Sequence, residues 1–155
     1  MSVINLIRSC PLFYELYDEE IEKIVSKCSV LKFKDGETIM KEGDNGSELY
    51  VILSGQAHTT KIVRDRPLRV GELKKGDVFG ETVLINEMTR ATSVIADGGG
   101  CDVLLVDHDS IFKLFREDTK VFAVLVLNLA RMLTARLRAS SRAITAMHEK
   151  TKKAA

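Results

Sequence analysis

Short β-rich runs divided by glycine occupy the middle of the chain and constrain its fold more than any other feature. Turn signals such as Gly55 and Gly98-Gly99-Gly100 separate the runs, a pattern typical of sandwiches and jelly-roll barrels. The sequence predicts a mainly β protein with flanking helices, built on an eight-stranded jelly-roll-like β-barrel with an N-terminal helix and a long C-terminal helix. The predicted strands are residues 37–40, 48–53, 57–63, 68–73, 93–96 and 102–106. Between two of them, Arg64-Asp65-Arg66-Pro67 predicts an exposed hairpin tip.

Helical patterns flank this β-rich region. Three acidic residues from Asp18 onward precede Ile21 and Ile24, and this order predicts an amphipathic helix near the N-terminus. After Asp109 the apolar spacing becomes helical, with a short turn around Ile111 and then a long helix over about residues 119–148. We expect a single domain over residues 1–155, with a helical part at about 1–28, a barrel at about 29–107 and C-terminal helices at about 109–148.

The long helix carries an apolar stripe. Leucines recur every four residues from Leu125 to Leu137, and Ile144 and Met147 continue the stripe. We expect the first half of the helix to pack on the barrel. The second half has few partners left in this chain, so its stripe either lies exposed or meets a second copy of the chain. A helix that packs only within its own chain is the alternative.

Residues 79–90 combine a glycine, a carboxylate and a guanidinium in one short segment. Gly80 before a helical start lets backbone N–H groups approach a phosphate closely. Arg90 supplies a planar fork for two phosphate oxygens, whereas Glu81 suits the hydroxyls of a ribose. A ligand that carries both groups close together is a cyclic nucleotide. The plainer alternative is a surface ion pair between Glu81 and Arg90.

Phe79-Gly80-Glu81 followed by Thr89-Arg90-Ala91-Thr92 resembles the phosphate-binding cassette of the cyclic-nucleotide-binding domain family. The resemblance extends through Lys34-Asp35-Gly36-Glu37, Leu49-Tyr50-Val51-Ile52-Leu53-Ser54-Gly55 and Lys75-Gly76-Asp77-Val78, and covers roughly residues 10–140. It implies that Gly80, Thr82 and Ala91 offer backbone N–H groups to the ligand phosphate. It also implies that Arg90 binds the phosphate with its side chain and that Glu81 binds the ribose 2′-hydroxyl.

The chain departs from the family pattern at Thr89, where proline is usual, and this loosens the backbone before Arg90. Family members that prefer cyclic GMP often carry threonine directly after the arginine. That place is Ala91 here, which has no hydroxyl, so the resemblance favours cyclic AMP over cyclic GMP. Thr92 is a possible base contact that could compensate.

The family's C-terminal helix often covers the nucleotide base. By likeness, Arg136 is a candidate base contact, with a solvated helix charge as its alternative. A second alignment places Ser140 and Ser141 there instead.

The resemblance implies a stand-alone sensor that relays nucleotide binding through its C-terminal helices to an unknown effector protein, with a homodimer through the long helix as a possibility. The alternative is a nucleotide-free interaction domain of the same fold. No nucleophile with a base and no metal-ligand spacing stands out, since His58, His108 and His148 lie in separate elements. We therefore expect neither an enzyme nor a metal or other cofactor.

Charge and apolar content argue against nucleic-acid and membrane partners. The chain has 23 basic and 22 acidic residues, and its longest apolar stretch, residues 121–127, is far shorter than a membrane span. Only a few residues follow the long helix, so no DNA-reading domain is expected, and the lysines there predict a frayed end. We expect a cytoplasmic protein whose Cys10, Cys28 and Cys101 are free, mostly buried thiols.

Overall fold

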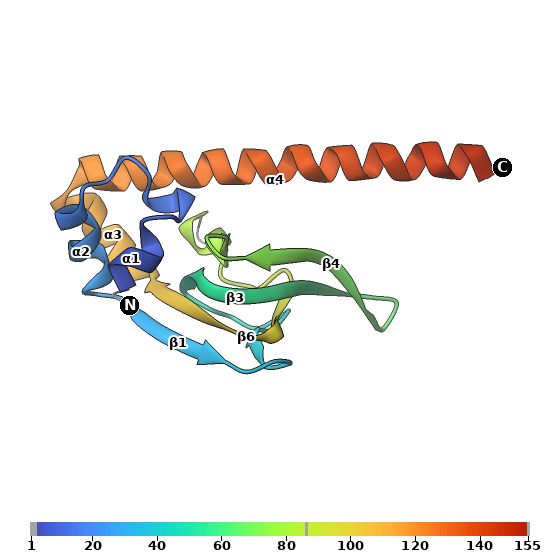
Figure 1. Cartoon of the computed structure of the whole chain (residues 1–155), viewed down its shortest axis with the longest axis horizontal. Helices are drawn as coiled ribbons and strands as arrows, with labels where there is room; N and C mark the ends of the chain where they lie inside the picture. The colour runs from blue at the N-terminus through green and yellow to red at the C-terminus, as the bar shows by residue number, and fades with distance from the viewer. Residues whose placement is uncertain (1–2, 86, 155) are drawn as a thin grey trace.

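The computed structural model describes residues 3–85 and 87–154, and within them six strands form one antiparallel sheet that is rolled up as a jelly roll (Figure 1). The strand order is β1-β6-β3-β4, and β2 and β5 pair with β6 and β3 respectively. The mainly β fold with flanking helices is therefore confirmed. The strands are β1 Ser29–Phe33, β2 Thr38–Met40, β3 Glu48–Val63, β4 Arg66–Lys74, β5 Val78–Phe79 and β6 Ser93–Asp107.

Helices gather at one end of this sheet, and the last of them runs along the molecule and past it (Figure 1). Acidic residues fill the first turn of α2, as the sequence predicts, and the side chain of Glu20 accepts a hydrogen bond from the N–H of Tyr17. The helices are α1 Val3–Ile7, η1 Pro11–Phe13, α2 Asp18–Val25, η2 Glu81–Ile85, α3 His108–Glu117 and α4 Thr119–Ala154.

The alternation of side chains along β3 divides the core into two clusters. Leu49, Val51 and Leu53 face the helices, and they pack with residues of η1, α2, α3 and α4. Tyr50 and Ile52 point the other way, into the interior of the barrel. The central strand thus couples the helical end of the molecule to the inside of the barrel.

The expected count of eight strands is wrong, because β3 and β6 each run continuously through a predicted break. Gly55 pairs with Cys101 and the next residue, Gln56, pairs with Asp97, so residues 98–100 bulge out of β6. A Cβ on Gly55 would lie 2.1 Å from the carbonyl oxygen of Gly100, which explains the glycine at this close approach. The predicted hairpin tip at residues 64–67 is shorter than expected: Arg64 and Asp65 join β3 to β4 with positive φ angles, whereas Arg66 and Pro67 already pair with β3 as the start of β4.

The long helix differs from its prediction in two respects. α4 does not end near His148 but continues to Ala154, and neither glycine nor proline occurs there to stop it. Its first half does not pack mainly on the barrel, as expected, but chiefly against η1 and α3. The amide of Asn128 donates hydrogen bonds to the carbonyl oxygens of Leu12 and Tyr14 at 3.1 and 2.7 Å. Among the helices of the described residues, none has the length and apolarity that crossing a membrane requires.

Candidate functional site

The segment that follows β5 turns sharply at Gly80 and continues as the short helix η2. Gly80 has a φ of +76°, a left-handed conformation that glycine adopts without a steric penalty. The predicted helical start after this glycine is therefore present, and Glu81 and Thr82 form its first turn, each half-buried. Asn86, which belongs to the same sequence pattern, lies outside the described residues.

Arg90 is buried, with 4% of its surface exposed, although it is always charged. Its Nη2 donates hydrogen bonds to the carboxylate of Glu48 at 3.1 Å and to the carbonyl oxygen of the same residue at 2.8 Å. Its Nη1 lies 3.4 Å from the carbonyl oxygen of Gly80. Because Arg90 is neutralised by Glu48 inside the protein, the alternative of a surface pair between Arg90 and Glu81 does not hold.

Two glycines make room for the guanidinium, because a side chain at either position would collide with it. A Cβ on Gly46 would lie 2.3 Å from Nη2 of Arg90, and a Cβ on Gly80 would lie 2.8 Å from Nη1. The guanidinium of Arg90 lies over the ring of Tyr50, with its carbon 5.9 Å from the ring centroid. Burial and the nearby Glu48 carboxylate raise the pKa of Tyr50, so its hydroxyl stays protonated at neutral pH. The guanidinium is therefore held in one orientation.

The backbone on either side of Arg90 is held by the loop between β2 and β3. The Arg90 N–H donates to the Asp44 carbonyl oxygen and the Gly46 N–H to that of Met88, at 2.9 and 3.0 Å. These bonds flank an isolated antiparallel β-bridge between Asn45 and Thr89. They restrain the approach to Arg90 at the position where the sequence lacks the family's usual proline.

One further backbone bond orients the peptide after Arg90. The N–H of Gly43 donates to the Arg90 carbonyl oxygen at 2.9 Å. Because N–H and C=O point in opposite directions across a trans peptide, the N–H of Ala91 faces away from Gly43. The carbonyl oxygen of Ala91 accepts a hydrogen bond from Nζ of Lys61 at 2.9 Å, and this lysine also lies 3.6 Å from the Glu42 carboxylate.

The remaining predicted contacts are Ala91 and Thr92, which directly follow Arg90, and Arg136, which lies far along the chain on α4. Thr92 is half-buried just before β6, and Ala91 is exposed. Arg136 of α4 donates a hydrogen bond to the carbonyl oxygen of Val78 in β5, two residues before Gly80. The candidate base contact thus touches the strand that leads into the site, while Ser140 and Ser141, its alternatives, are exposed on α4.

Reasoning from the sequence missed Glu48, Gly46 and Lys61. A signal for Glu48 was available: side chains alternate along a strand, so Glu48 shares a face with Tyr50 and Ile52. A carboxylate on a face that turns into a barrel needs a cation or several donors. No comparable signal marks Gly46, because its role depends on where Arg90 lies in space.

Thiol and metal chemistry find little support in the described parts of the chain. Within residues 3–85 and 87–154, no group of three or more His, Cys, Asp or Glu side chains is placed to hold a metal ion. The three cysteines are free, and burial raises the pKa of Cys10 to about 11 and that of Cys28 to about 12. Both thiols are therefore protonated at neutral pH and poor nucleophiles.

Comparison with known proteins agrees with this geometry. The family model described as "Cyclic nucleotide-binding domain" matches residues 30–118. The human cGMP-dependent protein kinase 2 is 29% identical over 132 residues, which cover 82% of this chain and 17% of the kinase. The cAMP-dependent protein kinase regulatory subunit of Mycosarcoma maydis is 36% identical over 101 residues, or 65% of this chain and 19% of the subunit. The chain spans less than a fifth of the length of these relatives.

A solved structure has the same fold. A cyclic nucleotide-binding domain from Methylobacillus flagellatus superposes with a TM-score of 0.81 at 24% identity, and the match covers 92% of this chain and 80% of that one.

Proposed function

The chain belongs to the cyclic nucleotide-binding domain family, and from that premise we propose that it is a sensor that binds cyclic AMP, and cyclic GMP less well, around Arg90. The observation that carries the proposal is the buried guanidinium of Arg90, fixed between Gly46 and Gly80 and paired with Glu48. A cation held in this way is preorganised for a phosphate, because little conformational freedom remains to be lost on binding.

In the proposed complex, the phosphate takes two N–H groups of Arg90 as a bidentate ligand. The backbone N–H groups of Gly80, Thr82 and Ala91 complete the phosphate site. The sharp turn at Gly80 and the fixed peptide after Arg90 support this arrangement. Glu81, at the start of η2, accepts hydrogen bonds from the ribose hydroxyl.

The preference for cyclic AMP rests on Ala91. This residue is exposed directly after Arg90 and has no hydroxyl to offer to the amino group of guanine. Thr92 and Arg136 are proposed to lie against the base, because Thr92 is half-buried beside the site and Arg136 reaches β5 from α4.

A relay to the C-terminal helices is supported by the way η2 packs. Val83 is fully buried and Leu84 is partly buried in the cluster that also holds Ile111 of α3 and Leu125 of α4. Ligand contacts at Glu81 and Thr82 would shift this short helix and, through the shared cluster, α3 and α4. Such a relay requires that the two arrangements of the helices bind the nucleotide unequally.

The exposed apolar stripe on the distal half of α4 supports a homodimer. Leu137, Ile144 and Met147 are each 68% exposed, and their spacing of seven and three residues is that of a coiled-coil seam. Figure 1 shows the end of this helix reaching beyond the tip of the β3–β4 hairpin. The downstream effector is then a protein that reads the position of α4.

Isothermal titration with cyclic AMP and cyclic GMP tests the function. The native protein should release heat with both, and Arg90→Ala should weaken binding on the order of a hundredfold, because two charge-assisted hydrogen bonds are lost. Arg69→Ala, which removes an exposed arginine of β4, is the matched control and should bind normally. If the folded native protein binds neither nucleotide, the nucleotide-free interaction domain is the correct reading.

A further inference from the structure

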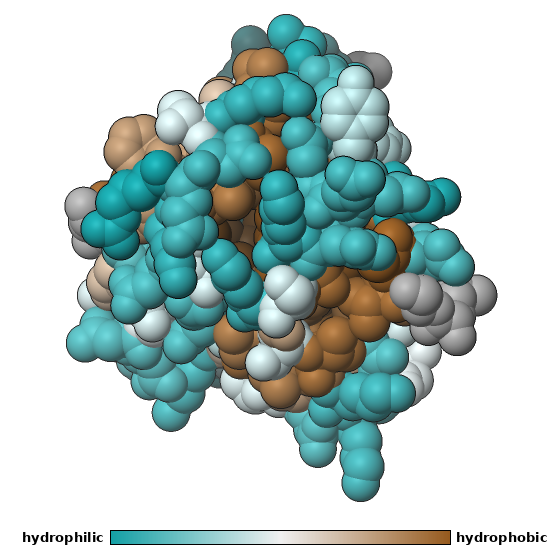
Figure 2. Space-filling view, turned by 90° about the vertical axis from the view of Figure 1, so that its left-hand side faces the viewer, coloured by the Kyte–Doolittle hydropathy of each residue, from teal (hydrophilic) through white to brown (hydrophobic). Residues whose placement is uncertain are grey.

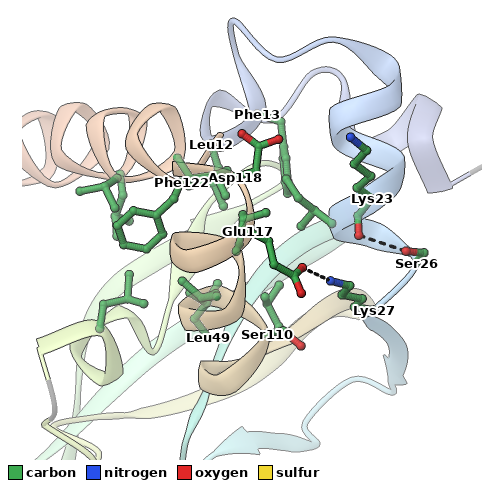
Figure 3. Close-up of a pocket in the computed structure, with 18 residues that line it drawn as sticks. Leu12, Phe13, Lys23, Ser26, Lys27, Leu49, Ser110, Glu117, Asp118 and Phe122 are labelled. Atoms are coloured by element: carbon green, nitrogen blue, oxygen red, sulfur yellow. Dashed lines mark hydrogen bonds and ion pairs between the residues drawn. The ribbon is translucent and has the colours of Figure 1, made fainter. Parts of the chain in front are cut away.

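A cavity of about 350 Å³ lies where the helical end of the molecule meets the barrel (Figure 3). Its walls come from η1, α2, β3, α3 and α4, and Leu84 of η2 also contributes. Arg90, Glu48 and Glu81 are not among its lining residues, so this cavity is separate from the proposed nucleotide site.

The inside of the cavity is apolar. Leu49 forms part of its floor, and the rings of Phe13 and Phe122 come from η1 and α4 on its other sides (Figure 3). Figure 2, which views the molecule from its helical end, shows hydrophobic side chains at the bottom of a hollow that hydrophilic side chains surround. An apolar cavity of this kind does not hold water well and gains from filling by an apolar molecule.

Charged residues at the rim neutralise one another. Nζ of Lys27 lies 3.3 Å from the Glu117 carboxylate, and this pair spans from the end of α2 to the end of α3 (Figure 3). The Asp118 carboxylate accepts a hydrogen bond from the N–H of Val121 at 3.2 Å. With Lys23, the rim carries two positive and two negative groups, so it attracts neither an anion nor a cation. Both members of the Lys27 pair are exposed, which makes the pair weak enough to open for entry.

We propose that this cavity binds a neutral, largely apolar small molecule of two or three fused rings. A cavity of about 150 Å³ lined by similar side chains accommodates benzene, and this one has more than twice that volume. Its volume falls in the range of pockets that enclose small organic ligands. The aromatic rings of Phe13 and Phe122 favour a flat ligand over a branched one.

Occupation of the cavity also affects the nucleotide site, a consequence that rests on the proposed function. Leu84 lies three residues after Glu81 in the same short helix, and it contacts the cavity. A molecule in the cavity should change the affinity for cyclic AMP, and cyclic AMP should change the affinity for that molecule by the same factor.

Titration with 1-aminoanthracene, a neutral fluorescent three-ring probe, tests the site without any nucleotide. We expect a saturable rise in fluorescence with one probe per chain. Val126→Trp should weaken binding at least tenfold, because Val126 of α4 lines the cavity. Leu127→Trp is the matched control: the two residues are adjacent and similarly exposed, at 42 and 49%, but Leu127 does not line the cavity. It should change binding less than twofold.

Nuclear Overhauser contacts between the probe and methyl groups locate the probe without relying on a variant. Contacts to Leu49, Leu84 and Leu125 would support the proposal. Contacts to Leu137 and Ile144 on the exposed stripe of α4, or no saturable binding, would overturn it. Because these measurements need no nucleotide, their failure is distinct from a failure to bind cyclic AMP.

Discussion

At the scale of single residues, one buried cation organises the proposed site. Arg90 is removed from water, and the Glu48 carboxylate and two carbonyl oxygens compensate its charge. Glu48 itself is only partly buried, with a third of its side chain exposed. The residues around Arg90 therefore act mainly by fixing its position.

Gly46→Ala tests this positioning role. Gly46 does not have a positive φ, so alanine suits its backbone, but the added Cβ would clash with the guanidinium. We expect the free energy of unfolding to fall by about 1–3 kcal/mol and nucleotide binding to weaken. In an Arg90→Ala background the same change should cost less than about 0.5 kcal/mol. Chemical denaturation of the four proteins gives both values, and equal costs in the two backgrounds would exclude the clash.

Ala91→Thr tests the base preference. A threonine hydroxyl here should raise the affinity for cyclic GMP relative to cyclic AMP by about 3–10-fold, the value of one net hydrogen bond. Ala91→Val has the same shape without the hydroxyl and should leave the ratio unchanged. Competition titrations with both nucleotides measure the ratio. A similar shift in both variants would mean that shape, and not hydrogen bonding, decides the preference.

Gly80 and Arg90 could be predicted from the sequence because their residue types and spacing already describe a phosphate site. Gly46 and Glu48 could not be assigned, since they lie over forty residues before Arg90 and meet it only through the pairing of the loop with the segment before β6. The sequence shows which groups are suited to a ligand. It does not show which groups hold them in place.

At the scale of elements, one residue, Asp107, both ends β6 and caps the N-terminus of α3. Asp107 ends β6, and its carboxylate accepts hydrogen bonds from the hydroxyl and the N–H of Ser110, at 2.6 and 2.8 Å. The N–H of the next residue, His108, donates to the carbonyl oxygen of Ser47. The start of α3 is therefore fixed to the barrel near the loop that carries Gly46.

Asp107→Ala should lower the free energy of unfolding by about 0.5–2 kcal/mol at pH 7. The hydrogen bond from the Ser110 hydroxyl, followed by backbone N–H groups, lowers the pKa of Asp107 below its ordinary value. The stabilisation is therefore complete above the unfolded-state pKa of about 3.9 and is lost as the pH falls through the lower folded value. Denaturation curves between pH 7 and 2 should show the difference from the native protein disappearing at the acid end.

Asp109→Ala is the control for this cap, since the side chain of Asp109 is fully exposed in the same turn. It should change stability little at any pH. If Asp109→Ala lowered the free energy of unfolding as much as Asp107→Ala does, the effect would come from the negative charge in the first turn and not from the cap.

The sequence predicted the positions of β2, β3, β4 and β6, but it missed β1 and β5 and did not reveal that β3 and β6 are continuous. Glycines at 55 and at 98–100 read as turns because most glycines between strands are turns. Here both strands continue: Gly55 stays paired with Cys101 in β3, and the glycines at 98–100 form the bulge in β6 directly after that pair. Whether a glycine ends a strand or bends it depends on the partner strand, which no local pattern reveals.

At the scale of the whole molecule, α4 is the element proposed to link the sensor to a partner. Its first half is tied to η1 through Asn128 and to β5 through Arg136, whereas its C-terminal end reaches past the β3–β4 hairpin (Figure 1). A change at the nucleotide site would therefore be read most easily as a change in the direction or pairing of this helix.

The double variant Leu137→Glu with Ile144→Glu tests the proposed dimer. Light scattering should give a dimer mass for the native chain that falls toward the monomer on dilution, and a monomer mass for the variant, because charges would face each other across the seam. Ala139→Glu places the same charge on the helix at an exposed position outside the seam and should remain dimeric. A native chain that is monomeric at every concentration would contradict the proposed dimer.

The most direct test of the central claim is a crystal structure of the protein with cyclic AMP. The account predicts the cyclic phosphate within about 2.7–3.2 Å of the Arg90 guanidinium nitrogens and the ribose hydroxyl at a similar distance from the Glu81 carboxylate. A nucleotide bound elsewhere, with Arg90 contacting only Glu48 and the backbone, would contradict it.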